Sequence, residues 1–126
     1  LTATSTTTVN DAPRLTVTKS LSPTTVAENG QLTYTFTIQN YGNTETLATD
    51  TTTLTDTFNP ILNPITVTYN GAAWAASNYT YDTATGVFTT TPGAITVPAA
   101  TATQNETTGI WTVTPGTTIL TVSGTV

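Results

Sequence analysis

The sequence predicts an all-β protein built as an antiparallel β-sandwich, and three observations support this prediction. The chain has 126 residues, of which 39 are threonine, a β-branched residue that favours strands. Apolar and polar residues alternate in run after run with the two-residue period of a half-buried strand. No segment carries the 3.6-residue period of an amphipathic helix. A chain of this length is expected to form one domain with a core of its own.

The clearest alternation occurs in two neighbouring runs. In residues 15–21, leucine and valine side chains share one face with Lys19. In residues 32–40, apolar and aromatic side chains share one face with Asn40, and turn residues follow. We therefore expect two strands whose core-facing sides each include a polar side chain.

Shorter runs of the same kind follow, separated by turn residues. The Asn70-Gly71 pair is a strong hairpin signal. About seven to nine short strands with this spacing are typical of an immunoglobulin-like antiparallel sandwich. The remaining runs are 54–58, 65–69, 79–81, 87–89, 95–97, 110–113 and 119–126.

Residues 1–12 differ from the rest and are expected to form an extended N-terminal arm outside a domain that spans residues 13–126. The arm alternates threonine with small or apolar residues. This patterning suits a donor strand that adds to another subunit, whereas a linker left over from a preceding repeat needs no such pattern. Both interpretations stay open at this point. The candidate donor-strand residues are Leu1, Ala3, Ser5, Thr7 and Val9.

Composition and charge exclude several classes of function. The formal net charge is −5, with only Lys19 and Arg14 as cations, so nucleic-acid binding is not expected. Cysteine and histidine are absent, which removes disulfides, thiolate ligands and the commonest general base. We therefore expect no enzyme activity and no cofactor. No stretch is long and apolar enough to span a membrane, no signal peptide is recognised, and the composition suits an extracellular setting.

Three segments carry a family resemblance. They read LTVTKSLSPTTVAENGQLTYTFTIQNYGN at 15–43, LTDTF at 54–58 and ILTVSGTV at 119–126. Together they resemble the DUF11 conserved repeat domain, and the stretch from 65 to 110 diverges most. The resemblance implies a β-sandwich module of the kind found in tandem in long bacterial and archaeal surface proteins, some of whose relatives look like filament subunits. It implies no catalytic residues.

Lys19, Asn40 and Asp56 are all expected on inner strand faces. A buried ammonium without a partner costs several kcal/mol, so Lys19 needs one. In one interpretation, Lys19 and Asp56 form a buried salt bridge and Asn40 caps a turn. In the other, the neutral Lys19 amine attacks the Asn40 amide with help from a protonated Asp56, ammonia leaves, and an intramolecular isopeptide bond forms.

Other candidate sites carry weaker signals. The acidic residues are scattered without calcium-loop spacing, so no metal site is expected. Asn78 and Asn105 begin triplets that fit the glycosylation acceptor pattern. Trp74 and Trp111, together with tyrosines, could stack against a sugar or could simply pack in the core.

Three functions follow as expectations. The first is a structural subunit of an extracellular filament, pilus-like fibre or surface assembly, in which copies of the chain add strands to one another head to tail. The second is one repeat of a long cell-surface stalk or adhesin. The third is a carbohydrate-binding module that contacts a glycan or a host surface. The expected partner is a second copy of the chain, and neither nucleic acid nor a membrane span is expected.

Overall fold

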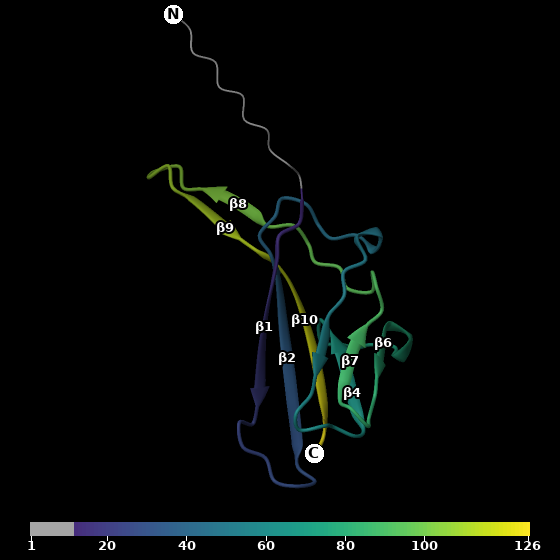
Figure 1. The fold of residues 1–126 in the computed structure, drawn as a ribbon. Coiled ribbons are helices and arrows are strands. Elements are labelled where there is room, and N and C mark those ends of the chain that lie inside the picture. The colour runs from purple at the N-terminus through teal and green to yellow at the C-terminus, as the bar shows by residue number, and fades with distance from the viewer. Residues whose placement is uncertain (1–11) are drawn as a thin grey trace, which may run out of the picture.

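The computed structural model describes residues 12–126, and this part of the chain is all-β. It contains ten strands in three antiparallel sheets and two short 3-10 helices, Ala48–Asp50 and Ala76–Asn78 (Figure 1). The predicted all-β antiparallel sandwich is confirmed. The two larger sheets form the sandwich, and the third sheet is a separate hairpin.

The larger sheet has five strands in the order β1-β2-β10-β4-β5. Two ten-residue strands form its centre, and their pairing sets Leu120 opposite Phe36. Long runs of threonine, valine and aromatic residues favour this extended pairing. The strands are β1 (Leu15–Ser22), β2 (Gln31–Asn40), β4 (Ile65–Tyr69), β5 (Ala72–Ala73) and β10 (Gly116–Thr125).

The smaller sheet has three strands in the order β3-β7-β6. These are β3 (Thr55–Thr57), β6 (Tyr79–Tyr81) and β7 (Val87–Thr90). The third sheet consists of β8 (Thr101–Gln104) and β9 (Trp111–Thr114), which form a hairpin that projects from one end of the sandwich, opposite the C terminus (Figure 1).

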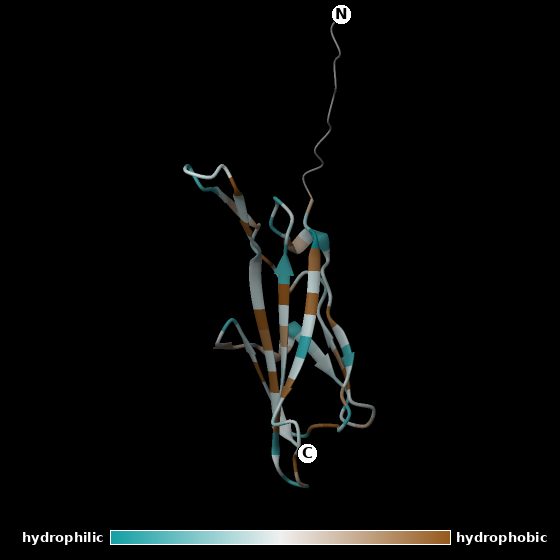
Figure 2. Cartoon of the chain, turned by 90° about the vertical axis from the view of Figure 1, so that its left-hand side faces the viewer, coloured by the Kyte–Doolittle hydropathy of each residue, from teal (hydrophilic) through white to brown (hydrophobic). Residues whose placement is uncertain are grey.

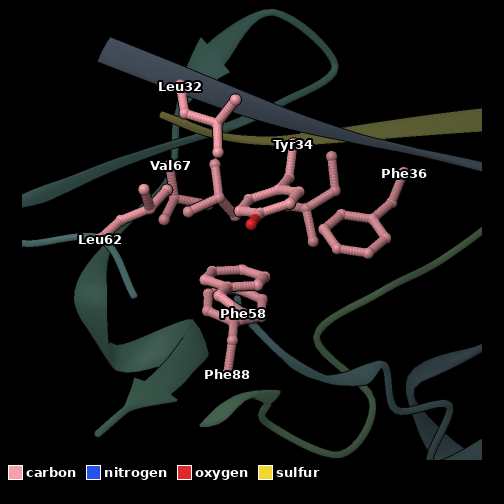
Figure 3. Packing of buried hydrophobic residues seen from close by; sticks show 9 residues of the cluster. Leu32, Tyr34, Phe36, Phe58, Leu62, Val67 and Phe88 are labelled. Atoms are coloured by element: carbon pink, nitrogen blue, oxygen red, sulfur yellow. The ribbon is translucent and has the colours of Figure 1, made fainter. Parts of the chain in front are cut away.

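The core lies between the two sandwich sheets. Every second residue of β2 from Leu32 to Asn40 is buried, as its alternation predicts. Phe58 and Phe88 approach β2 from the opposite layer, and the ring of Phe58 stacks on Tyr34 with centroids 4.5 Å apart (Figure 3). The aromatic stack joins the two sheets.

A second buried cluster contains Ile38, Ile95 and Val97. The alternation predicts a strand at 95–97, but the structure has irregular backbone there. The polar groups of Val97 are satisfied by Thr46, whose N–H donates to the Val97 carbonyl and whose Oγ1 accepts from the Val97 N–H at 2.7 Å. The backbone and side chain of Thr46 together therefore replace a neighbouring strand at Val97.

The inner face of β1 was expected to be buried, and this expectation is wrong. All eight residues of β1 are exposed, including Val17 at 52%. The reason is the unequal width of the sheets: β1 forms the edge of the five-stranded sheet, and the opposing sheet has only three strands. Figure 2 looks onto this side of the molecule and shows hydrophobic and polar bands alternating along the uncovered strand.

Candidate functional site

The open side of the sandwich is the candidate site, because β1 is an unusually long free edge. Within residues 12–126, the other three edges of the two sandwich sheets are β5, β3 and β6, with two, three and three residues. Proteins commonly limit unwanted strand pairing by keeping edge strands short. The eight residues of β1 are not shortened in this way.

The backbone of β1 presents free hydrogen-bonding groups along this edge. The Tyr41 N–H donates to the Arg14 carbonyl at 2.8 Å, and Leu15 lies opposite Asn40 in the β1–β2 register. In an antiparallel pair, residues that bond to the neighbouring strand alternate with residues that point away from it. The N–H and C=O groups that point away from β2, toward the open edge, are therefore those of Leu15, Val17, Lys19 and Leu21.

A cleft with a mostly apolar lining lies between the Leu15 end of β1 and the segment that leads into β3. It is an open cavity of about 130 Å³. An apolar protein cavity of about 150 Å³ can hold a benzene molecule, so this one accommodates a single aliphatic side chain. Its apolar lining consists of Leu15, Val17, Ile38, Leu54 and Ile95.

Further along β1, Lys19 and Asp56 join the two sheets. The Lys19 Nζ lies 2.6 Å from the Asp56 Oδ2, and the two side chains are 38% and 24% exposed. The ammonium also lies 4.7 Å from the centre of the Tyr34 ring. Burial raises the pKa of Tyr34, and the Asp56 carboxylate adds to the shift, so this phenol stays neutral beside the ion pair.

The ion pair of the first interpretation is present, but Lys19 is not buried as expected. Pairs with this exposure stabilise a fold by about 0.2–1 kcal/mol. The pair therefore adds little to stability and places a charged contact between the two sheets at this edge.

Asn40 does not join Lys19 and Asp56. It lies opposite Leu15 whereas Lys19 lies opposite Phe36, four residues further along the strand, which corresponds to about 13 Å. Its buried side chain accepts the Arg14 and Gly42 N–H groups at 3.0 and 2.8 Å and donates to the Thr44 carbonyl at 2.7 Å. The structure therefore shows Asn40 as a turn cap and offers no geometry for an isopeptide bond.

The hairpin β8–β9 is a second exposed surface. One face carries only threonine, and the other carries Ala102, Gln104, Trp111 and Val113 according to the pairing register. Trp111 is 62% exposed and Val113 is 54% exposed. The alternation in residues 110–113 predicted β9, but the run TATQ of β8 has no apolar alternation that could have predicted its partner.

The aromatic residues do not form one sugar-stacking platform. Trp74 is partly buried and stacks between Tyr69 and Tyr79, with centroids 5.0 and 6.1 Å away. Within residues 12–126, no ring contact includes Trp111. The two tryptophans therefore belong to different surfaces.

The glycosylation candidates differ in accessibility. Asn105 is exposed at the tip of the hairpin, where its Oδ1 accepts the N–H groups of Thr107 and Thr108. Asn78 is half-buried, and its backbone is bonded on both sides. Of the two, only Asn105 lies in an open turn.

The acidic side chains are dispersed. In the part of the chain that the structure describes, no three acidic, histidine or cysteine side chains gather as metal ligands would. Asp82 is exposed and caps a turn, where hydrogen bonds from the N–H groups of Ala84 and Thr85 lower its pKa. It has a local structural role.

The candidate donor-strand residues Leu1, Ala3, Ser5, Thr7 and Val9 lie outside the described residues. The described chain begins at Ala12, which contacts Gly42 at the end of the sandwich where β1 starts. Residue 11 is therefore bonded to the described chain at this end.

Comparison of the chain with family models, curated proteins and solved structures gives no match. The resemblance to the DUF11 repeat domain stays an expectation. Residues 12–126 include no helix with the length and apolar character needed to cross a membrane.

Proposed function

We propose that the chain is a structural subunit of an extracellular filament or surface assembly in which copies join by β-strand addition. One observation carries this proposal: β1 is an eight-residue open edge whose apolar inner face is uncovered. A single extended segment from another copy would bond to the free backbone groups and cover the apolar face at the same time.

The N-terminal arm has the chemistry that this edge requires. Residues 1–10 carry no charged side chain, and their alternation gives one face with apolar ends at Leu1 and Val9. A chain that donates its arm to the next copy and accepts an arm from the previous one makes a head-to-tail contact. Repetition of such a contact produces an open fibre.

A module of a long stalk is the alternative, and it uses the same edge. There the strand would come from a neighbouring repeat of the same polypeptide, in keeping with the DUF11 resemblance. The two proposals differ in what the isolated chain does, because only a self-assembling subunit forms fibres on its own.

Negative-stain microscopy of the full chain and of residues 13–126 tests the proposal. We expect fibres from the full chain and dispersed particles from the truncated chain, because the truncated chain has an acceptor edge and no donor. Equal assembly of both chains would refute strand addition by the arm.

Two double variants of the arm test whether its apolar face, and not merely the presence of the arm, is needed for assembly. The pair Leu1→Asp and Val9→Asp places charge on this apolar face, and we expect it to abolish fibres. The pair Thr2→Asp and Thr8→Asp adds the same charge to the opposite face and should leave fibres intact.

A further inference from the structure

We infer that the arm of a second copy adds to the open edge of β1, outside the Lys19–Asp56 ion pair and parallel to β1, with its Leu1 side chain in the cavity beside Leu15. This inference rests on the proposed function and specifies where the arm binds, in which direction it runs, and which of its residues lies beside which residue of β1. The occupant is the segment 1–9 of another copy.

The side-chain patterns of the open edge and the arm match in size and polarity. Going along the inner face of β1, the open side of the sandwich offers the apolar cavity at Leu15 and Val17, then the ion pair of Lys19, then Leu21. A parallel arm that starts at the cavity sets Leu1 beside Leu15, Ala3 beside Val17, Ser5 beside Lys19 and Thr7 beside Leu21.

The middle of the arm suits the ion pair beneath it. Ser5 is the inward residue at this register, and its small hydroxyl can bond to the Asp56 carboxylate without displacing Lys19. A large apolar side chain at this position would bury the ion pair without a polar partner, which is costly. The apolar residue is instead at the end of the arm, where the cavity lies.

The strand direction follows from where the arm is joined to the sandwich. Ala12 contacts Gly42, at the end where β1 begins, so each arm is joined to its sandwich at that end. An arm antiparallel to the β1 that it joins would come from a chain whose start lies at the same end. That arrangement occurs only if the chain's own arm folds back onto its β1, or if two copies exchange arms and form a closed dimer. An arm that enters from the Ser22 end runs parallel to β1 and joins copies head to tail.

The arm is long enough for this path. Twelve extended residues span about 40 Å, whereas β1 with its eight residues spans about 26 Å. The difference leaves a few residues, including Asn10 and Asp11, to connect one sandwich to the next.

Cysteine cross-linking tests the site and the direction together, since the chain contains no cysteine of its own. The full chain carrying Ala3→Cys and Val17→Cys is treated with a short thiol-to-thiol cross-linker and separated under denaturing conditions. We expect a ladder of covalent oligomers. The matched variant with Thr7→Cys and Val17→Cys is expected to give little product, because a parallel arm places Thr7 near Leu21.

Each other outcome has a defined meaning. A cross-linked monomer or dimer from the Thr7 variant would show an antiparallel arm, folded back or reciprocally exchanged, and would overturn the inference. If fibres depend on the arm but neither variant cross-links, the arm does not add to β1 and the inference is overturned. A third variant, with Ala3→Cys and Ala73→Cys, would then give a ladder if the arm adds to β5, the opposite edge of the sheet. Fibres that ignore the arm would overturn the proposed function itself.

Discussion

Phe58→Ala is expected to lower the free energy of unfolding by about 3–5 kcal/mol, the range for removing a large buried aromatic side chain. Phe58 is 1% exposed and lies at the centre of the aromatic cluster. Its ring packs on Tyr34 at 4.5 Å, on Tyr81 at 5.6 Å and on Phe88 at 5.7 Å, measured between ring centroids. The substitution therefore removes the contact that joins the two sheets, and urea denaturation measures the loss.

Trp111→Ala is the matched control, because it deletes an even larger aromatic side chain from an exposed position. Trp111 is 62% exposed on the projecting hairpin. Exposed substitutions of this kind usually change stability by no more than about 0.5 kcal/mol. Equal losses from the two variants would contradict the assignment of Phe58 to the core.

Asn40→Ala is expected to lower the free energy of unfolding by about 2–4 kcal/mol. Its side-chain amide satisfies the N–H groups of Arg14 and Gly42 and the carbonyl of Thr44. Gly42 is buried, and each buried polar group left without a partner costs about 1–3 kcal/mol. Because Arg14 immediately precedes β1, the same change should also loosen the start of the acceptor edge.

Two further variants check this explanation by denaturation. Gln39→Ala removes the neighbouring amide, which accepts the Tyr41 hydroxyl at the surface, and should cost less than about 1 kcal/mol. Asn40→Asp keeps the acceptor oxygen but sets a buried carboxylate oxygen against the Thr44 carbonyl, so it should cost clearly more than Gln39→Ala. If Asn40→Ala is as mild as Gln39→Ala, the cap does not stabilise the loop.

The alternation of β2 and β10 could be predicted because both strands lie under the second sheet. Their inner residues, from Leu32 to Asn40 and from Gly116 to Gly124, are buried as the period-two pattern requires. The same pattern predicts a buried face for β1, and this prediction is wrong. Alternation tells which side chains share a face, but a second layer decides whether that face is covered, and the layer opposite β1 is too narrow.

Part of the candidate site could also be predicted from the sequence. The partnership of Lys19 with Asp56 followed from the need of a charge on an apolar strand face for a counter-ion. The separation of Asn40 from this pair did not follow, because pattern alone gives no strand register. The β8 strand was missed because its four residues alternate threonine only with alanine and glutamine and include no large apolar side chain.

Amide hydrogen exchange on the full chain, assembled and held dispersed by dilution, tests the central claim most directly. Strand addition at β1 predicts that assembly slows exchange at Leu15, Val17, Lys19 and Leu21, whose N–H groups point to the open edge. Thr16, Thr18 and Ser20, which already bond to β2, should be protected in both states. If fibres form while the four edge amides still exchange as fast as in the dispersed chain, β1 is not the acceptor.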